Sequence, residues 1–219
     1  MARNIIFVTL FLLFYGGLFL LGNHKETDLT DRNGYGVFDG SEYESERFGI
    51  KLDFDDDWLV FDGVSIENTF LSQMTSAEIE ESYGAPMSNI AFIAGGAIPD
   101  ATVYCISLLD IRLTDADLNE TTMRSTIDYM KKAIESQGGK VGSTSCRRIS
   151  AKGNGAPMLL YYYDYEIAGT SESVFACLTN SGGNAIMLGG VYNNYNGLKA
   201  LTELAENGLW VTSQAETTV

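Results

Sequence analysis

Four alternating segments with very short separators, between residues 142 and 192, constrain the fold more than any other feature of this sequence. The separators are Gly153-Asn154-Gly155, Gly169-Thr170-Ser171 and Ser181-Gly182-Gly183-Asn184, and each is a cluster of turn-forming residues. Connections this short join antiparallel neighbours, because a parallel pair needs a long crossover. The sequence therefore predicts a four-stranded antiparallel meander over residues 142–192.

Further strands are expected before the meander. Phe48, Ile50 and Leu52 alternate with Gly49, Lys51 and Asp53, as a half-buried strand requires. The other expected elements here are a strand resuming at Trp58 and Val60, a short helix opened by Thr75-Ser76-Ala77-Glu78 and ended by Gly84, and strands near 90–93 and 101–111 separated by the turn signals Gly95-Gly96 and Pro99-Asp100.

Two helices complete the pattern. Residues 119–136 carry one apolar stripe, formed by Met123, Ile127, Met130 and Ile134 at helical spacing, and Gly138-Gly139 follows it. A last helix is expected at 198–207, with Leu198, Leu201 and Leu204 buried. Together these elements predict an α+β fold, an antiparallel sheet with helices on its faces.

In this order of elements the chain resembles the PsbP-like family, the α/β/α sandwich of photosystem II extrinsic proteins and related bacterial lipoproteins. The resemblance covers roughly residues 47–212 and is carried by the opening FGIKLDFDDDW, the long helix, the meander and the terminal helix. Such sequences often carry Pro-x-Gly-Trp where this chain has Asp55-Asp56-Asp57-Trp58. The resemblance implies the fold and transfers no functional residue.

The N-terminus contains an uncharged, apolar run from Ile5 to Gly22, preceded by Arg3. As a helix this run is ~27 Å long, which is at the short end of what crosses a membrane. The favoured reading is an uncleaved single-pass anchor at the cell membrane with the rest of the chain outside, while secretion after signal cleavage and a buried core helix stay open. The domain division is an anchor or signal over 1–22, an acidic flexible tether over 23–46, a globular domain over 47–212 and a tail over 213–219.

Charge and residue inventory exclude several functions. The net charge of -15 disfavours nucleic acid as a partner, and the one histidine, His24, lies in the tether. A Ser-His-Asp site or a histidine-built zinc site in the domain is therefore excluded, and no phosphate-binding glycine motif is present. An envelope hydrolase that uses carboxylates or a bound metal ion stays open as the alternative function, with Asp164 and Glu166 on one strand face.

Two acidic runs have the alternating spacing of the first half of a calcium loop: Asp53, Asp55 and Asp57, and Asp115, Asp117 and Asn119. Both lack the glycine and the final glutamate of that loop, so a solvated turn and a helix N-cap are the plain alternatives. No cofactor is expected. A weak calcium site is possible, centred on Asp55, Asp56 and Asp57.

The segment Tyr161-Tyr162-Tyr163-Asp164-Tyr165 places Tyr161, Tyr163 and Tyr165 on one strand face, where core packing is expected. Tyr162 takes the opposite face. Exposed aromatic and amide groups favour recognition of a glycan or peptide, and this predicts a ligand-binding surface. Its expected residues are Tyr162, Asn193, Asn194, Tyr195 and Asn196.

The cysteines, Cys105, Cys146 and Cys177, are odd in number, so at least one thiol is unpaired in a monomer. In a meander Cys146 and Cys177 lie two strands apart, ~9.5 Å, which is too far for a disulfide and leaves Cys105 as the one partner open to either. The plain alternative is that all three are small buried apolar residues. The function expected from the sequence is a membrane-tethered, extracytoplasmic binding or scaffolding domain of the cell envelope. Its expected partners are the membrane, through residues 5–22, and an envelope protein or glycan.

Overall fold

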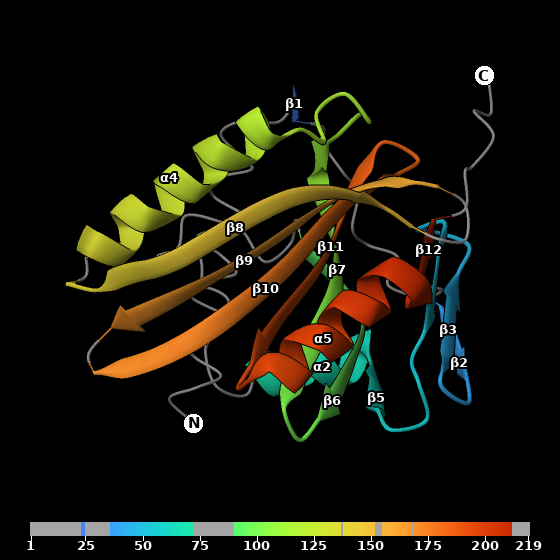
Figure 1. The fold of residues 1–219 in the computed structure, drawn as a ribbon. Helices are drawn as coiled ribbons and strands as arrows, with labels where there is room; N and C mark the ends of the chain where they lie inside the picture. Colours follow the sequence, from blue (N-terminus) through green and yellow to red (C-terminus); the bar gives the residue numbers. More distant parts are fainter. Residues whose placement is uncertain are drawn as a thin grey trace.

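The structure is a computed structural model that describes residues 23–24, 36–71, 90–136, 138–151, 155–167 and 169–211. Within these ranges the chain forms two antiparallel sheets and few helices (Figure 1). No helix in the described ranges is both long and apolar enough to cross a membrane. The expected membrane segment, the expected helix opened by Thr75 and the expected tail lie outside the described residues.

The large sheet contains eight strands in the order β5-β6-β7-β11-β10-β9-β8, with β1 paired to β7 outside this path. Strands β8 to β11 are sequential antiparallel neighbours, which confirms the predicted meander. The strands of this sheet are β1 (Asn23–His24), β5 (Leu59–Asp62), β6 (Ile90–Ile98), β7 (Ala101–Arg112), β8 (Lys140–Ser150), β9 (Pro157–Ile167), β10 (Thr170–Ser181) and β11 (Asn184–Tyr192).

The small sheet has the order β12-β4-β3-β2, and its strands β2 and β3 show that the expected tether over residues 23–46 is wrong for its described part from residue 37 onward. Its strands are β2 (Val37–Asp39), β3 (Glu42–Ser45), β4 (Ile50–Asp53) and β12 (Leu209–Val211). The hairpin of β2 and β3 belongs to the folded domain because Tyr43 is buried, with its ring centroid 5.0 Å from that of Phe38. The acidic composition of this segment suggested a tether, although Phe38 and Tyr43 within it pack against the core.

The described residues also form the helices α2 (Gly63–Leu71), α4 (Glu120–Ser136) and α5 (Tyr195–Glu203) and the π-helical turn η2 (Leu204–Gly208). Helix α4 lies along β8 (Figure 1) and matches the expected long helix, with Asn119 capping it. The last helix differs from the expected 198–207, because it begins at Tyr195 and becomes π-helical at Leu204. Helix α2 was not expected.

The large sheet buries apolar side chains on both faces. We call the side that packs against α4 the α4 face and the side that packs against α5 and the small sheet the α5 face. Tyr161, Tyr163 and Tyr165 are buried on the α4 face, where the first two rings stack with centroids 5.2 Å apart, so their expected core packing is confirmed. On the α5 face, the Ser181 hydroxyl donates to the Phe48 carbonyl oxygen at 2.6 Å and ties the two sheets together.

Gly95 and Gly96 lie inside β6 and not in the turn that the sequence suggested. An aromatic ring lies directly against each of them. A Cβ on Gly95 would lie 2.5 Å from the Phe61 ring, and one on Gly96 would lie 2.8 Å from the Phe54 ring. These glycines therefore allow aromatic side chains to pack directly on the strand backbone, which the sequence pattern cannot distinguish from a turn.

The three cysteines form no disulfide, so Cys146 and Cys177 are not joined, as expected, and neither is joined to Cys105. In the strand register, Cys146 lies opposite Tyr161 and Cys177 lies opposite Leu160. Because Leu160 and Tyr161 are adjacent on β9 and point to opposite faces of the sheet, the two thiols also lie on opposite faces. Cys105 and Cys177 are fully buried, and burial raises the pKa of Cys177 to about 12. These two thiols act as small apolar side chains of the core.

Candidate functional site

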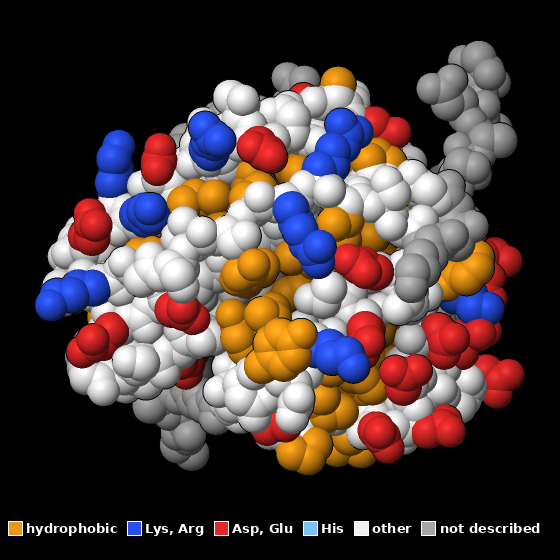
Figure 2. All heavy atoms as spheres, viewed as in Figure 1, with side chains coloured by type: hydrophobic (Ala, Val, Ile, Leu, Met, Phe, Trp, Pro, Cys, Tyr) orange, Lys and Arg blue, Asp and Glu red, His pale blue; other side chains and the backbone are white. Residues whose placement is uncertain are grey.

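The tyrosines that the sequence assigned to a binding surface lie on the same side of the molecule. Tyr162 is half-buried on the α5 face of β9, where it packs against the core that α5 covers. Tyr195 is the first residue of α5 and its side chain is 77% exposed. Figure 2 shows that hydrophobic side chains gather in the middle of this side of the molecule, with charged side chains around them.

Two of the predicted asparagines hold the start of α5 in place. Asn194 is its N-cap, because its side-chain oxygen accepts from the backbone N–H of Asn196 at 2.9 Å and of Gly197 at 3.1 Å. Its side-chain nitrogen donates to Asp100 Oδ1 at 2.8 Å, and the backbone N–H of Asn193 donates to the Asp100 carbonyl oxygen at 2.9 Å. Asn193 and Asn194 therefore anchor α5 to the turn between β6 and β7, while Asn196 is exposed.

A polar cluster that the sequence did not predict lies beside Tyr162. Asp164 Oδ2 accepts from the Ser143 hydroxyl at 2.6 Å, and Asp164 Oδ1 accepts from the Ser173 hydroxyl at 2.7 Å. Ser173 is paired with Asp164 on one side and with Tyr192 on the other, so these residues form one row across β9, β10 and β11. The row brings a carboxylate, two hydroxyls and a phenol together on the α5 face.

Ser143 reaches Asp164 through an irregularity in the edge strand. The pairing of β8 with β9 shifts register between Val141 and Thr144, which adds residues to β8 opposite Asp164. A Cβ on Gly142 would lie only 3.4 Å from that of Asp164, so the two strands approach closely here. Such a bulge has no distinct sequence signal beyond Gly142 itself, and this explains why sequence reasoning missed the contact.

Tyr192 connects this row to α5. Burial is the largest cause that raises the pKa of Tyr192, and the charge of Asp164 is the next. A Cβ on Gly197 of α5 would lie 3.1 Å from the Cβ of Tyr192, so the first turn of the helix rests against this tyrosine. We call Tyr162, Asp164, Ser173, Tyr192 and Tyr195 the tyrosine–aspartate surface.

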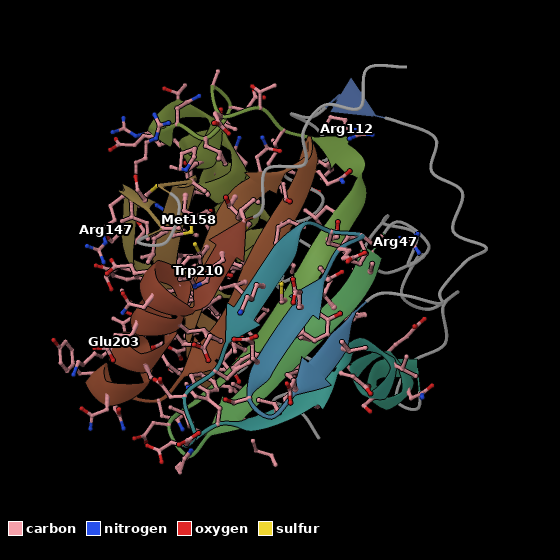
Figure 3. All side chains as sticks on the ribbon, turned by 90° about the vertical axis from the view of Figure 1, so that its right-hand side faces the viewer. Arg47, Arg112, Arg147, Met158, Glu203 and Trp210 are labelled. Atoms are coloured by element: carbon pink, nitrogen blue, oxygen red, sulfur yellow. The ribbon has the colours of Figure 1, made fainter. Side chains whose placement is uncertain are left out.

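One cation of the α5 face is already engaged by another residue of the chain. Arg147 on β8 forms an ion pair with Glu206 at 3.2 Å, which links the edge strand to η2. Figure 3 shows Arg147, Met158 and Glu203 on the side that carries α5, whereas Arg47 and Arg112 lie on the other side of the view. Within the described ranges, no salt bridge joins Asp164 to a lysine or arginine.

The two acidic runs differ in what they contact. Asp55, Asp56 and Asp57 are exposed in a turn that the Trp58 N–H closes by donating to the Asp55 carbonyl oxygen at 3.0 Å. In the described part of the chain, no three His, Cys, Asp or Glu side chains converge as a metal site requires. Asp117 accepts from both the backbone and the hydroxyl of Thr114, so the second run organises the start of α4.

Asp164 and Glu166, the carboxylates of the alternative hydrolase function, have different surroundings. Asp164 accepts hydrogen bonds from two serines, as described above, while Glu166 is exposed and lies opposite Lys140 in the register of β8 and β9. No observation on the described residues favours this function over binding.

No protein-family model and no curated protein matches the sequence. Among solved structures, the solution structure of cyanobacterial PsbP (CyanoP) from Synechocystis sp. PCC 6803 is similar to this chain with a TM-score of 0.47 and 12% identity. The match covers 80% of this chain and 95% of that chain. The likeness concerns the fold alone, and the site and its chemistry are argued below from this chain's own residues.

Proposed function

We propose that this chain is a binding or scaffolding domain of the cell envelope that holds a partner through the tyrosine–aspartate surface. The observation that carries the proposal is the row of the hydrogen-bonded Asp164, Ser173 and the half-buried Tyr192 on the α5 face, followed along the chain by the exposed Tyr195 at the start of α5. Tyr195 is 77% exposed, so most of its ring area is not buried on folding and adds little to the stability of the domain. Tyrosines placed on a rigid sheet and helix are typical of recognition surfaces.

The domain is proposed to work outside the cytoplasm, held at the membrane by residues 5–22. Support comes from the apolar run itself and from Arg3 before it, since positive charge is retained on the cytoplasmic side. Protease added to intact protoplasts is expected to digest the domain, which is followed as loss of the full-length band on immunoblots against the C-terminal half. Protection of the domain until the protoplasts are lysed would contradict this topology.

Partner binding is tested by removing the two tyrosines at the centre of the surface. In full-length protein solubilised in a neutral detergent, Tyr162→Ala with Tyr195→Ala is expected to reduce the recovery of co-purifying envelope components at least tenfold. The reason is that hot-spot aromatics carry much of an interface's binding energy, about 2 kcal/mol or more each. The measurement is quantitative mass spectrometry of the material retained on the tagged protein.

The matched control is Tyr129→Ala. Tyr129 is 37% exposed on α4, so this variant removes an exposed tyrosine from another part of the molecule. Its recovery of partners should equal that of the unaltered protein, and thermal melting should show that all variants are folded. Full recovery by the double variant would eliminate this surface as the binding site.

A further inference from the structure

We propose that Asp164, placed between Tyr162 and Tyr192, binds the charged end of a lysine or arginine side chain from a basic segment of a partner protein. This inference rests on the proposed binding function and names the chemistry of the partner. Asp164 lies on the α5 face of β9, two residues from Tyr162, and is in register with Ser173, which is in register with Tyr192.

The carboxylate is fixed before any ligand arrives. Ser143 and Ser173 donate to its two different oxygens at 2.6 and 2.7 Å, from the strands on either side of β9. An ionised carboxylate has about four acceptor positions, so each oxygen keeps capacity for a further donor. An ammonium or guanidinium group supplies such donors together with the opposite charge. The two serines therefore orient the acceptor without neutralising it.

The chain supplies no cation of its own to this carboxylate within the described ranges. Arg147, on the same face of β8, is paired with Glu206, and Lys140 lies opposite Glu166 in the register. Asp164 is half-buried, and a partly buried charge whose bonds come only from hydroxyls gains more from a cationic partner than an exposed one does. This is the property expected of a recognition group and not of a structural ion pair.

The neighbouring rings favour the same class of ligand. Tyr192 is close enough to Asp164 for the carboxylate charge to contribute, after burial, to its raised pKa. Aromatic faces attract ammonium and guanidinium groups. An anionic ligand would be repelled by Asp164 and by the net charge of -15, which instead steers basic segments toward the molecule.

The test uses full-length protein in neutral detergent and a terminally capped hexalysine peptide as the probe, measured by isothermal titration calorimetry at 150 mM salt. The matched probe is the same peptide acetylated on every side-chain nitrogen, which keeps the length and removes the charge. A neutral oligosaccharide, the N-acetylglucosamine hexamer, serves as the third probe. Hexalysine is expected to bind, and the two neutral probes are expected to bind at least tenfold more weakly.

Variants separate this site from general attraction to an acidic protein. Asp164→Asn keeps the shape and one acceptor, and it is expected to weaken hexalysine binding at least fivefold. Asp128→Asn removes the same charge from an exposed position on α4 and should change binding by less than twofold. Thermal melting of each variant confirms that it is folded.

Equal weakening by the Asp164 and Asp128 variants would overturn the inference, because binding would then follow net charge alone. Tighter binding of the oligosaccharide than of hexalysine would also overturn it and would identify the surface as a glycan site. Neither result affects the proposed binding function, which is decided by partner recovery from the tyrosine variants. A loss of partner recovery in the tyrosine variants with no hexalysine binding would leave that function standing and reject the cation.

Discussion

Replacement of Phe175 with alanine is expected to lower the free energy of unfolding by about 3–5 kcal/mol. Phe175 is fully buried in the middle of β10, and its register neighbours on the α5 face are Tyr162 on β9 and Gly190 on β11. Removal of the ring loses its burial and leaves a cavity that Gly190 has no side chain to fill. Urea denaturation followed by tryptophan fluorescence measures the loss.

Two further variants show whether the loss comes from the cavity. Phe175→Leu keeps most of the buried volume and should lose less than half as much stability as Phe175→Ala. Tyr195→Ala removes a ring that is 77% exposed and should change the free energy of unfolding by less than about 0.5 kcal/mol. A loss below about 1 kcal/mol in Phe175→Ala would contradict the tight packing of the α5 face.

The elements that the sequence predicted correctly are those whose signals are local. The turn clusters at Gly169 and at Ser181 to Asn184 set β9, β10 and β11 as neighbours, because a chain that reverses within a few residues has no other strand to pair with. The apolar stripe of α4 is also local, since its four members recur within a few turns of one helix.

The small sheet was missed because its pairing is not local. Strand β12, near the C-terminal end of the described residues, pairs with β4, which lies far away in the sequence. No turn signal beside either strand predicts this pairing. The segment around Tyr43 has an acidic composition that is typical of a tether, and only the burial of that tyrosine shows that the segment is folded. The turn predicted at Gly95 and Gly96 was wrong for a related reason. The rings that lie against these glycines come from earlier parts of the chain, Phe61 from β5 and Phe54 from the turn after β4.

The candidate site was predictable in part. Period-two alternation places Tyr162 and Asp164 on the same face, opposite to Tyr161 and Tyr163, and the structure shows this arrangement. The contact of Asp164 with Ser143 depends on the register shift in β8, and the cover of Tyr192 by the first turn of α5 depends on how that helix packs. Of the asparagines, Asn194 caps α5, the role that asparagine before a helix favours, and Asn193 holds the same turn through its backbone N–H.

Replacement of Gly197 with alanine is expected to impair both stability and binding. A Cβ at this position would overlap the Asp100 carbonyl oxygen and lie 3.1 Å from the Cβ of Tyr192. The first turn of α5 would have to move away from β7 and β11, and overpacking of this kind costs about 1–3 kcal/mol. In an exposed helix the same change would stabilise by up to about 1 kcal/mol, so the sign of the effect is diagnostic.

The measurements are urea denaturation and hexalysine titration of the same full-length protein. Asn196→Ala is the matched control, because Asn196 is exposed in the same turn. Its backbone N–H donates to the Asn194 side chain, and the hydrogen bond to the Asp100 carboxylate comes from Asn194 and not from Asn196. We expect Gly197→Ala to weaken hexalysine binding at least threefold, because the displaced first turn of α5 no longer packs against Tyr192, which lies in register with Ser173. Unchanged stability together with unchanged binding would show that the turn containing Asp100 yields to the added methyl group, and that α5 does not position the tyrosine–aspartate surface.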